Sequence, residues 1–221
     1  MAPNATESIL LVYHKSTIPG ADKPIHALAG EIAGITGINT GAVTLDEALA
    51  SGCASADTVF SLLTTRGGHY ASLVDRCKPR YTLHARIPPQ VIAEAILSWI
   101  GAYNMSCENI ILIYIRARRN VSLQIEDINN IKKHLEDEGL GVQPVPWIEN
   151  SPLQALEVEE RTCLAPLVLL RGTLTSKLYS TYEGSRIIPP LAVAGYNLLA
   201  AWILYEIQFS YNSVREPAGR M

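Results

Sequence analysis

The chain has 221 residues, of which 48% are hydrophobic and 18% are charged, so it can bury a sizeable core and does not read as a disordered protein. Its 18 Lys and Arg residues against 21 Asp and Glu residues give a net charge of -3. That balance excludes a protein that coats polyanions through bulk charge, and we expect no nucleic-acid partner. The length fits one large α/β domain or two smaller ones.

The N-terminus and the most apolar stretch bear on localisation. Residues 1–8 are polar and lack a basic segment followed by an apolar run, which argues against a signal peptide and predicts a cytoplasmic protein. Residues 187–204 come closest to a membrane span, but they include Pro189, Pro190 and Gly195. We interpret that stretch as a buried helix with a proline start and expect no membrane partner.

The cysteines are scattered along the chain. Cys53, Cys77, Cys107 and Cys163 form no C-x-x-C pair, so neither a zinc ribbon nor a thioredoxin-like motif is supported. Isolated buried thiols are the favoured interpretation, and the cytoplasmic prediction is unchanged.

Apolar runs alternate with helical patterns in the N-terminal half. Residues 9–13 form a short continuous apolar run, which is typical of a strand buried on both faces of a parallel sheet. The following segments read as helices over 24–35, 45–51 and 89–103 and as strands over 59–63 and 81–84. This order predicts an open, mostly parallel sheet covered by helices.

The same order returns in the C-terminal half. Strands are predicted over 110–115, 142–147 and 164–170, and helices over 125–138, around 152–160 and over 189–207. Tyr13 and Tyr114 are separated by the same number of residues as Pro88-Pro89 and Pro189-Pro190. We therefore predict two copies of one α/β unit, an N-terminal domain of residues 1–104 and a C-terminal domain of residues 105–221.

Two histidines of the first copy have no counterpart in the second. His14 follows the first strand, and the second copy has Ile115 at the same place. His69 follows a later strand, and the matching strand of the second copy is followed by residues 173–175, which include no histidine. Because the carboxyl ends of parallel strands form the ligand crevice of such sheets, we expect His14 and His69 to share one chemical role. The alternative for each is an ordinary hydrogen-bonded or solvent-facing histidine.

The pair predicts metal or proton chemistry. Neutral imidazole binds first-row divalent metals and is a base near neutral pH. Two imidazoles make a weak site, which suits a protein that holds a metal transiently and passes it on. Gly67 and Gly68 permit positive φ and close backbone approach, so their loop is expected to lie against a flat ligand, with an ordinary tight turn as the alternative.

Three segments occur in a recognisable order. They are Leu11-Val12-Tyr13-His14-Lys15-Ser16, then residues 62–69 ending in Arg66-Gly67-Gly68-His69, then a helix opened by Ile87-Pro88-Pro89. In order and separation they resemble the type II chelatases, the sirohydrochlorin cobaltochelatase and ferrochelatase family. The resemblance covers all of the first copy, and the second copy is similar to the long, two-domain members.

The resemblance implies a fold and an activity. The fold would be two similar chelatase-like domains, each a small, mostly parallel sheet flanked by helices, facing a central cleft. The activity would be that of a lyase of siroheme or cobalamin biosynthesis, which inserts cobalt, iron or nickel (Co²⁺, Fe²⁺ or Ni²⁺) into sirohydrochlorin or a related tetrapyrrole. His14 and His69 would be the metal ligands and catalytic proton acceptors. The metal is a substrate, no organic cofactor is expected, and the chain would be a monomer or a homodimer.

A polycarboxylate substrate also calls for cations. The residues expected to bind it are Lys15, Ser16, Arg66, Gly67, Gly68 and Arg116, with Arg118 and Arg119 as further candidates. The alternative for the charged ones is ordinary surface charge at strand ends.

Two positions depart from the family pattern. Lys15 stands where the family usually has glycine after the first histidine, and Leu73 stands where it has an acidic residue. A shifted substrate, a different metal or a loss of activity would each account for them, so the alternative function is a non-catalytic tetrapyrrole- or metal-binding protein. A hydrolase or a P-loop protein would need G-x-S-x-G or a P-loop motif, and neither is present.

Overall fold

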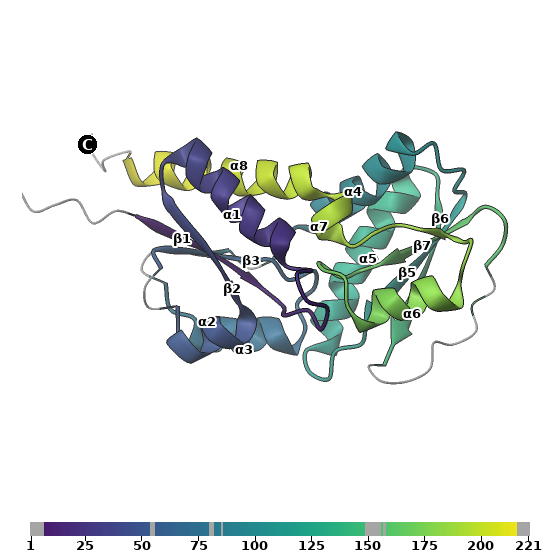
Figure 1. Ribbon diagram of the computed structural model, residues 1–221, viewed down its shortest axis with the longest axis horizontal. Coiled ribbons are helices and arrows are strands. Elements are labelled where there is room, and N and C mark those ends of the chain that lie inside the picture. Colours follow the sequence, from purple (N-terminus) through teal and green to yellow (C-terminus); the bar gives the residue numbers. More distant parts are fainter. Residues whose placement is uncertain are drawn as a thin grey trace, which may run out of the picture.

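Two parallel sheets form the framework of the protein, as seen in a computed structural model that describes residues 7–53, 56–79, 82–84, 86–148, 156 and 158–215 (Figure 1). The first sheet has the order β2-β1-β3-β4 and the second β6-β5-β7-β8. Their strands are β1 (Ser8–Tyr13), β2 (Asn39–Thr44), β3 (Thr58–Ser61), β4 (Thr82–His84), β5 (Asn109–Ile115), β6 (Gly141–Trp147), β7 (Thr162–Pro166) and β8 (Arg186–Ile187). The identical strand order confirms the predicted α/β class and the internal repeat.

Helices connect the strands, and local signals set several of their ends. They are α1 (Lys23–Thr36), α2 (Leu45–Ser51), α3 (Gly68–Arg76), α4 (Pro89–Ala102), α5 (Val121–Asp137), α6 (Thr173–Thr181), α7 (Leu191–Ala194) and α8 (Tyr196–Arg215). Proline lies in the first turn of α1 and of α4, where its missing N–H costs nothing. Gly37 ends α1 with φ 70°, and Thr44 and Glu47 form a capping box at the start of α2.

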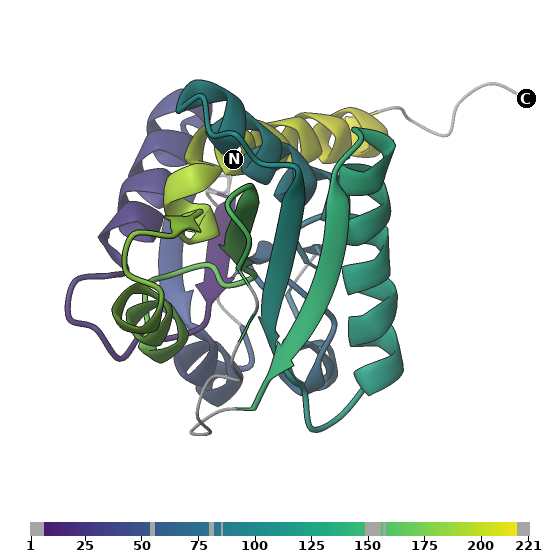
Figure 2. The ribbon, with the colours of Figure 1, turned by 90° about the vertical axis from the view of Figure 1, so that its right-hand side faces the viewer.

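The central strands are apolar throughout because both faces of each sheet are covered. Along β1, Leu11 faces a core shared by both sheets, whereas Val12 faces a separate cluster beneath α2 and α3. In the second sheet, Leu112 belongs to the shared core and Ile113 to a cluster beneath α6. Figure 2 shows α5 and α6 on opposite sides of the second sheet. This two-sided burial is the physical origin of the continuous apolar runs.

The last helix of each half crosses to the other half. α8 packs along α1 (Figure 1). Its Trp202 meets Phe60 of β3 edge to face, with ring centroids 5.6 Å apart. α4 packs against α5, and its Ile92 and Ile96 lie beside β7. The predicted boundary near residues 104–108 falls between α4 and β5. Because α4 and α8 each pack against the opposite half, one continuous core joins the two sheets.

Several predicted elements differ from the observed ones. The predicted strand over 164–170 ends at Pro166, and Leu167, Leu169 and Leu170 are apolar because they enter the shared core as loop residues. The predicted helix around 152–160 is wrong at residues 156 and 158–160, and its other residues lie outside the described ones. Four elements, β2, α3, α6 and β8, were not predicted.

The interpretation of the cysteines as isolated thiols is wrong. Cys53 is bonded to Cys77 and Cys107 to Cys163, with Cα–Cα distances of 5.0 and 5.7 Å. Each pair joins segments within one half, so the partners are adjacent through the fold and not through sequence spacing. Disulfides are typical of oxidising compartments and of the intracellular proteins of hyperthermophiles.

The predicted single helix over 189–207 is broken at Gly195 into α7 and α8. Across the described residues, no helix has the length and apolarity needed to cross a bilayer. A Cβ on Gly195 would lie 2.6 Å from the Cβ of Ala95 and 2.9 Å from Cδ1 of Leu191. The glycine therefore lets the start of α8 touch α4 directly.

Gly195→Ala is expected to lower the free energy of unfolding by about 1–3 kcal/mol, the usual cost of overpacking. The measurement is chemical denaturation followed by circular dichroism. The double variant Ala95→Gly/Gly195→Ala should recover part of the loss, because one of the two closest contacts is relieved. An unchanged stability in the single variant would contradict the close packing of α4 on α8.

Replacing Cys53 and Cys77 together by Ala is expected to lower the free energy of unfolding by about 3 kcal/mol, because a disulfide restricts the unfolded chain. The check is urea denaturation with and without dithiothreitol. The reductant should destabilise the wild type more than this variant. The pairing would be contradicted if the wild type carried free thiols after purification in air and its stability did not change with reductant.

Candidate functional site

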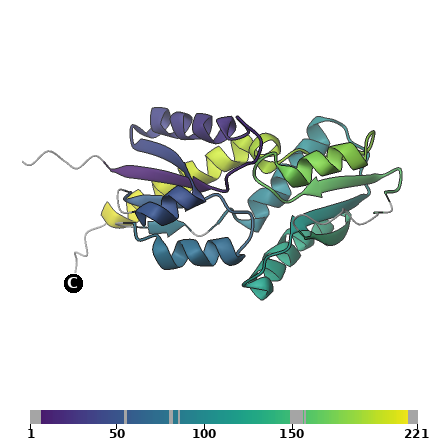
Figure 3. The same cartoon turned by 60° about the horizontal axis from the view of Figure 1, so that its bottom comes forward.

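The site is built from the loops that follow β1, β3, β5 and β7. Parallel strands place these loops at the carboxyl edge of each sheet, and the two edges meet (Figure 3). The Ser16 hydroxyl in the loop after β1 donates to the carbonyl of Arg171 after β7. Thr64 Oγ1, after β3, donates to the carbonyl of Leu167 at 3.3 Å. The second half therefore closes over the loops that carry the histidines.

His14 and His69 come together as the strand order predicts. Their rings are stacked, with centroids 4.6 Å apart and an interplanar angle of 29°, and both side chains are exposed. His14 directly follows β1, and His69 lies in the first turn of α3, after β3. Because β1 and β3 are hydrogen-bonded neighbours, residues that are distant in sequence reach one point.

The geometry of His14 leaves one ring nitrogen available. His14 Nδ1 lies 3.3 Å from the carbonyl oxygen of Lys15. A carbonyl only accepts hydrogen bonds, so Nδ1 must be the donor in this contact, which leaves Nε2 free to bind a metal or accept a proton. In the stacked arrangement the two rings lie nearly parallel, so a shared ligand requires one of them to rotate.

Among the described residues, no group of three or more His, Cys, Asp and Glu side chains is arranged to hold a metal. The histidine pair is thus a two-ligand arrangement in the described part of the chain. Such an arrangement favours transient over permanent metal binding, because a complete shell would retain the ion. In the second half, the positions that correspond to His14 and His69 are Ile115 and the buried Leu174.

A polar network fixes the loop that carries His14. The Tyr13 hydroxyl donates to Oδ2 of Asp22 at 3.2 Å and lies 3.2 Å from Nε2 of His26. Burial and the charge of Asp22 raise the pKa of Tyr13 to about 12, so the hydroxyl remains a donor at neutral pH. The network joins the end of β1 to the first residues of α1 and closes the base of the loop between them.

The glycine pair does not use the positive φ that it permits. Gly67 has φ -84°, and neither Gly67 nor Gly68 is among the described glycines in the left-handed region. A Cβ on Gly67 would lie 3.1 Å from the Cβ of Ala117, and one on Gly68 would lie 3.4 Å from the Cβ of Arg119. The close backbone approach exists, but it is to the loop after β5.

Arg66, expected to bind substrate, is held by carboxylates. Its backbone N–H and Nε donate to Asp127 at 2.7 and 2.9 Å, and its guanidinium also pairs with Glu126 at 2.9 Å. Arg86 pairs with Asp127 as well, at 2.7 Å. The Arg66 guanidinium therefore joins the first half to α5. We assign it this structural role in place of the expected contact with substrate.

Asp127 is the charged centre of this contact, and its side chain has 0% exposure. Burial opposes its ionisation, but hydrogen bonds from Arg86 and Arg66 outweigh it and hold the pKa of Asp127 below its ordinary value of 3.8. Gln124, one turn earlier on α5, donates to Thr65 Oγ1 at 3.2 Å and accepts from Ala117 N–H at 2.8 Å. The sequence analysis missed both residues, although each is a polar residue on the apolar face of α5.

The remaining predicted residues divide into two groups. Ser16 is engaged with the Arg171 carbonyl, while Lys15 and Arg116 are exposed. Hydrogen bonds from Thr44 lower the pKa of Glu47, and the charge of Lys15 adds to this, so Lys15 lies near the start of α2.

Leu73 lies on the buried face of α3 and is fully buried. This position therefore faces the core and not the site.

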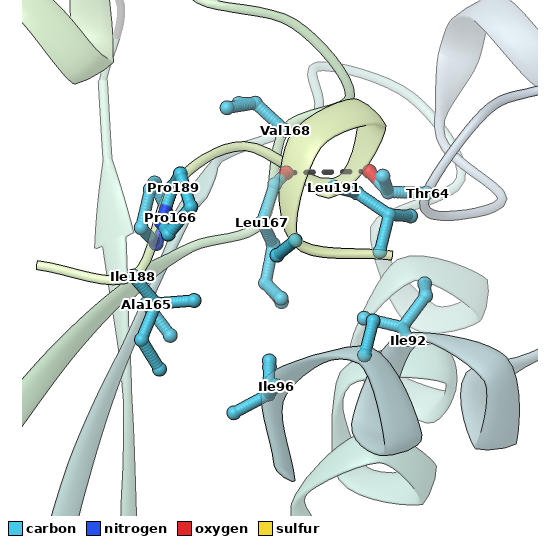
Figure 4. Close-up of a pocket in the computed structure, with 12 residues that line it drawn as sticks. Thr64, Ile92, Ile96, Ala165, Pro166, Leu167, Val168, Ile188, Pro189 and Leu191 are labelled. Atoms are coloured by element: carbon cyan, nitrogen blue, oxygen red, sulfur yellow. Dashed lines mark hydrogen bonds between the residues drawn. The ribbon is translucent and has the colours of Figure 1, made fainter. Parts of the chain in front are cut away.

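An apolar gap lies between α4, β7 and α7, with a volume of about 10 Å³ (Figure 4). Its lining includes Ile92, Ile96, Ala165 and Leu191, and Thr64 at its edge makes the hydrogen bond to Leu167. That volume suits about one water molecule and not an organic substrate. Neither histidine of the pair lines it, so we assign it to packing between the halves.

No family model and no curated protein matches the sequence. Among solved structures, the chain is similar to CbiX, described as the terminal enzyme for biosynthesis of siroheme in denitrifying bacteria. The TM-score is 0.60 at 15% identity, over 90% of this chain and 99% of that chain. The chain has a chelatase-like fold.

A second solved structure is DR2241 from Deinococcus radiodurans, described as a multi-domain protein with structural similarity to chelatases. Its TM-score is 0.47 at 12% identity, over 89% of this chain and 54% of that chain. At 15% identity the likeness to CbiX establishes the fold alone, and the chemistry must be argued from the residues of this chain.

Asp127→Asn is expected to lower the free energy of unfolding by about 3 kcal/mol at pH 7, because it removes the buried carboxylate that pairs with Arg86 and one of the two that pair with Arg66. The folded pKa of Asp127 is below its unfolded value, so its contribution to stability is complete well above the unfolded pKa of about 3.9 and is lost as the pH falls through the folded pKa. Urea denaturation over this range should give a flatter pH dependence for the variant than for the wild type.

Glu126→Gln is the matched control, since Glu126 is 56% exposed and its ion pair within the described part of the chain is with Arg66. Its effect should stay below about 1 kcal/mol. Equal losses in the two variants would show that the buried carboxylate has no special role in joining the halves.

Proposed function

We propose that this protein inserts a divalent metal, Co²⁺, Fe²⁺ or Ni²⁺, into sirohydrochlorin or a related tetrapyrrole. The observation that carries the proposal is the stacking of His14 and His69 at 4.6 Å at the carboxyl ends of adjacent strands. The chelatase-like fold supports it, because CbiX, which is similar to this chain with a TM-score of 0.60, is described as an enzyme of siroheme biosynthesis.

The histidines are suited to both halves of the reaction. Metal insertion releases the pyrrole N–H protons of the macrocycle, so it needs a weak metal ligand and a base at the same place. His14 offers Nε2 for either role, since Nδ1 is engaged with the Lys15 carbonyl. His69, beside it, supplies the second imidazole, and the absence of a third ligand among the described residues favours release of the metal to the ring.

A cationic rim would bind the acidic side chains of the macrocycle. Lys15 and Arg116 keep this assignment, since both are exposed at strand ends. Burial raises the pKa of Tyr114 and the charge of Arg116 opposes that rise, which puts the Arg116 guanidinium close to the end of β5. Ser16, Gly67 and Gly68 shape the loops around the histidines, and Arg66 holds those loops against α5.

The second candidate is a non-catalytic protein that carries a tetrapyrrole or a metal. Lys15 favours it, because a long cationic side chain follows His14 directly and is exposed. A carrier would bind the macrocycle at the same loops without accelerating metal entry. Multiple turnover distinguishes the two candidates.

His14→Ala and His69→Ala are each expected to reduce metal insertion by roughly 100-fold or more, since each removes a ligand and proton acceptor. The measurement is an anaerobic absorbance assay with sirohydrochlorin and Co²⁺, Fe²⁺ or Ni²⁺ in turn. His134→Ala is the control, because His134 lies in the last turn of α5. Binding of sirohydrochlorin without acceleration by the wild type would favour the carrier, and the absence of binding would limit the likeness to the fold.

A further inference from the structure

Two arginines of the second half lie next to the histidine pair. Arg119, after β5, packs against Gly68, the residue before His69. Arg171, after β7, accepts a hydrogen bond at its carbonyl from Ser16, two residues after His14. Each arginine thus contacts a residue one or two positions away from one histidine of the pair, and both come from the half that has no histidine at the corresponding positions.

These two side chains differ from three other arginines of the fold. Arg66, Arg86 and Arg161 each pair with a carboxylate. In the part of the chain that the structure describes, no carboxylate is recorded as a partner of Arg119 or Arg171, and both are exposed. Arg116 and Arg118 share this loop with Arg119, so several positive charges gather here in a chain whose net charge is -3. Such a local excess attracts anions.

A contact with an aromatic ring orients the Arg171 side chain. Its guanidinium carbon lies 5.9 Å from the centre of the Tyr179 ring on α6, within the range of a cation–π contact. A guanidinium held over a ring can still donate hydrogen bonds from its N–H edges. A planar fork of N–H donors matches a carboxylate in bidentate geometry.

We infer that Arg119 and Arg171 bind carboxylates at the rim of the tetrapyrrole and select macrocycles by the number of their acidic groups. This inference rests on the proposed function. A phosphate is bound by donors that converge on one point, whereas these guanidiniums come from two loops and border different histidines. Separated cations suit an anion whose charges are spread around a ring.

The experiment measures the affinity for two metal-free porphyrins, uroporphyrin and coproporphyrin, which share a ring and differ in the number of rim carboxylates. Binding is followed by quenching of tryptophan fluorescence. The wild type should bind uroporphyrin more tightly. Arg119→Gln and Arg171→Gln should each weaken uroporphyrin binding by about tenfold, with a smaller effect on coproporphyrin and a shallower dependence on salt.

Two further variants make the result specific. Arg119→Lys, which keeps the charge, should retain much of the affinity that Arg119→Gln loses. Arg161→Gln is the matched control, since Arg161 pairs with Glu108 just before β7, at the amino edge of the second sheet. This variant should bind both porphyrins with the affinities of the wild type.

The outcomes separate this inference from the proposed function. If the wild type binds uroporphyrin and metallates sirohydrochlorin, but Arg119→Gln and Arg171→Gln bind both porphyrins as the wild type does, the inference is wrong and the proposed function stands. Equal losses for both porphyrins would also overturn it, since selection by carboxylate number would be absent. If the wild type binds neither these porphyrins nor sirohydrochlorin, the inference and the proposed function both fail.

Discussion

The buried carboxylate of Asp127 fixes how the two halves of the protein meet. It lies on α5 and accepts hydrogen bonds from Arg66 and Arg86 of the first half, one of them through the Arg66 backbone. Burying the Asp127 charge without partners would cost several kcal/mol. Its partner Arg66 lies in the loop after β3, so this loop must sit against α5 for the ion pair to form. That position brings Gly67 and Gly68 onto the loop after β5 and sets where α3, and with it His69, begins.

The exchange of α4 and α8 reinforces this arrangement. Each of these helices follows one sheet and packs beside the other half, so a single apolar core includes Leu11 and Phe60 as well as Ile110 and Leu112. Separating the halves would expose that core, which makes the interface an obligate part of the fold. A rigid interface of this kind suits a site assembled from the loops of both sheets, because its parts keep their spacing.

The two copies of the repeat have taken different roles at the site. The first copy supplies the imidazoles, while the second has Ile115 and the buried Leu174 at the corresponding positions. The second copy instead contributes Asp127 and Gln124, which hold the loop after β3, and the arginines that border the histidines. In the proposed reaction, one half would handle the metal and protons while the other would orient an anionic ring.

The sequence by itself determined the features that depend on local burial and on strand order. A strand covered on both faces must be apolar throughout, which reveals β1 and β5, and parallel strand ends bring His14 and His69 together. Tertiary structure decided the rest, including β2, a short edge strand of small and polar residues, the disulfides, and the ion pairs of Asp127. These features depend on which distant segments become neighbours, and the periodicity of one segment records only how its own faces are buried.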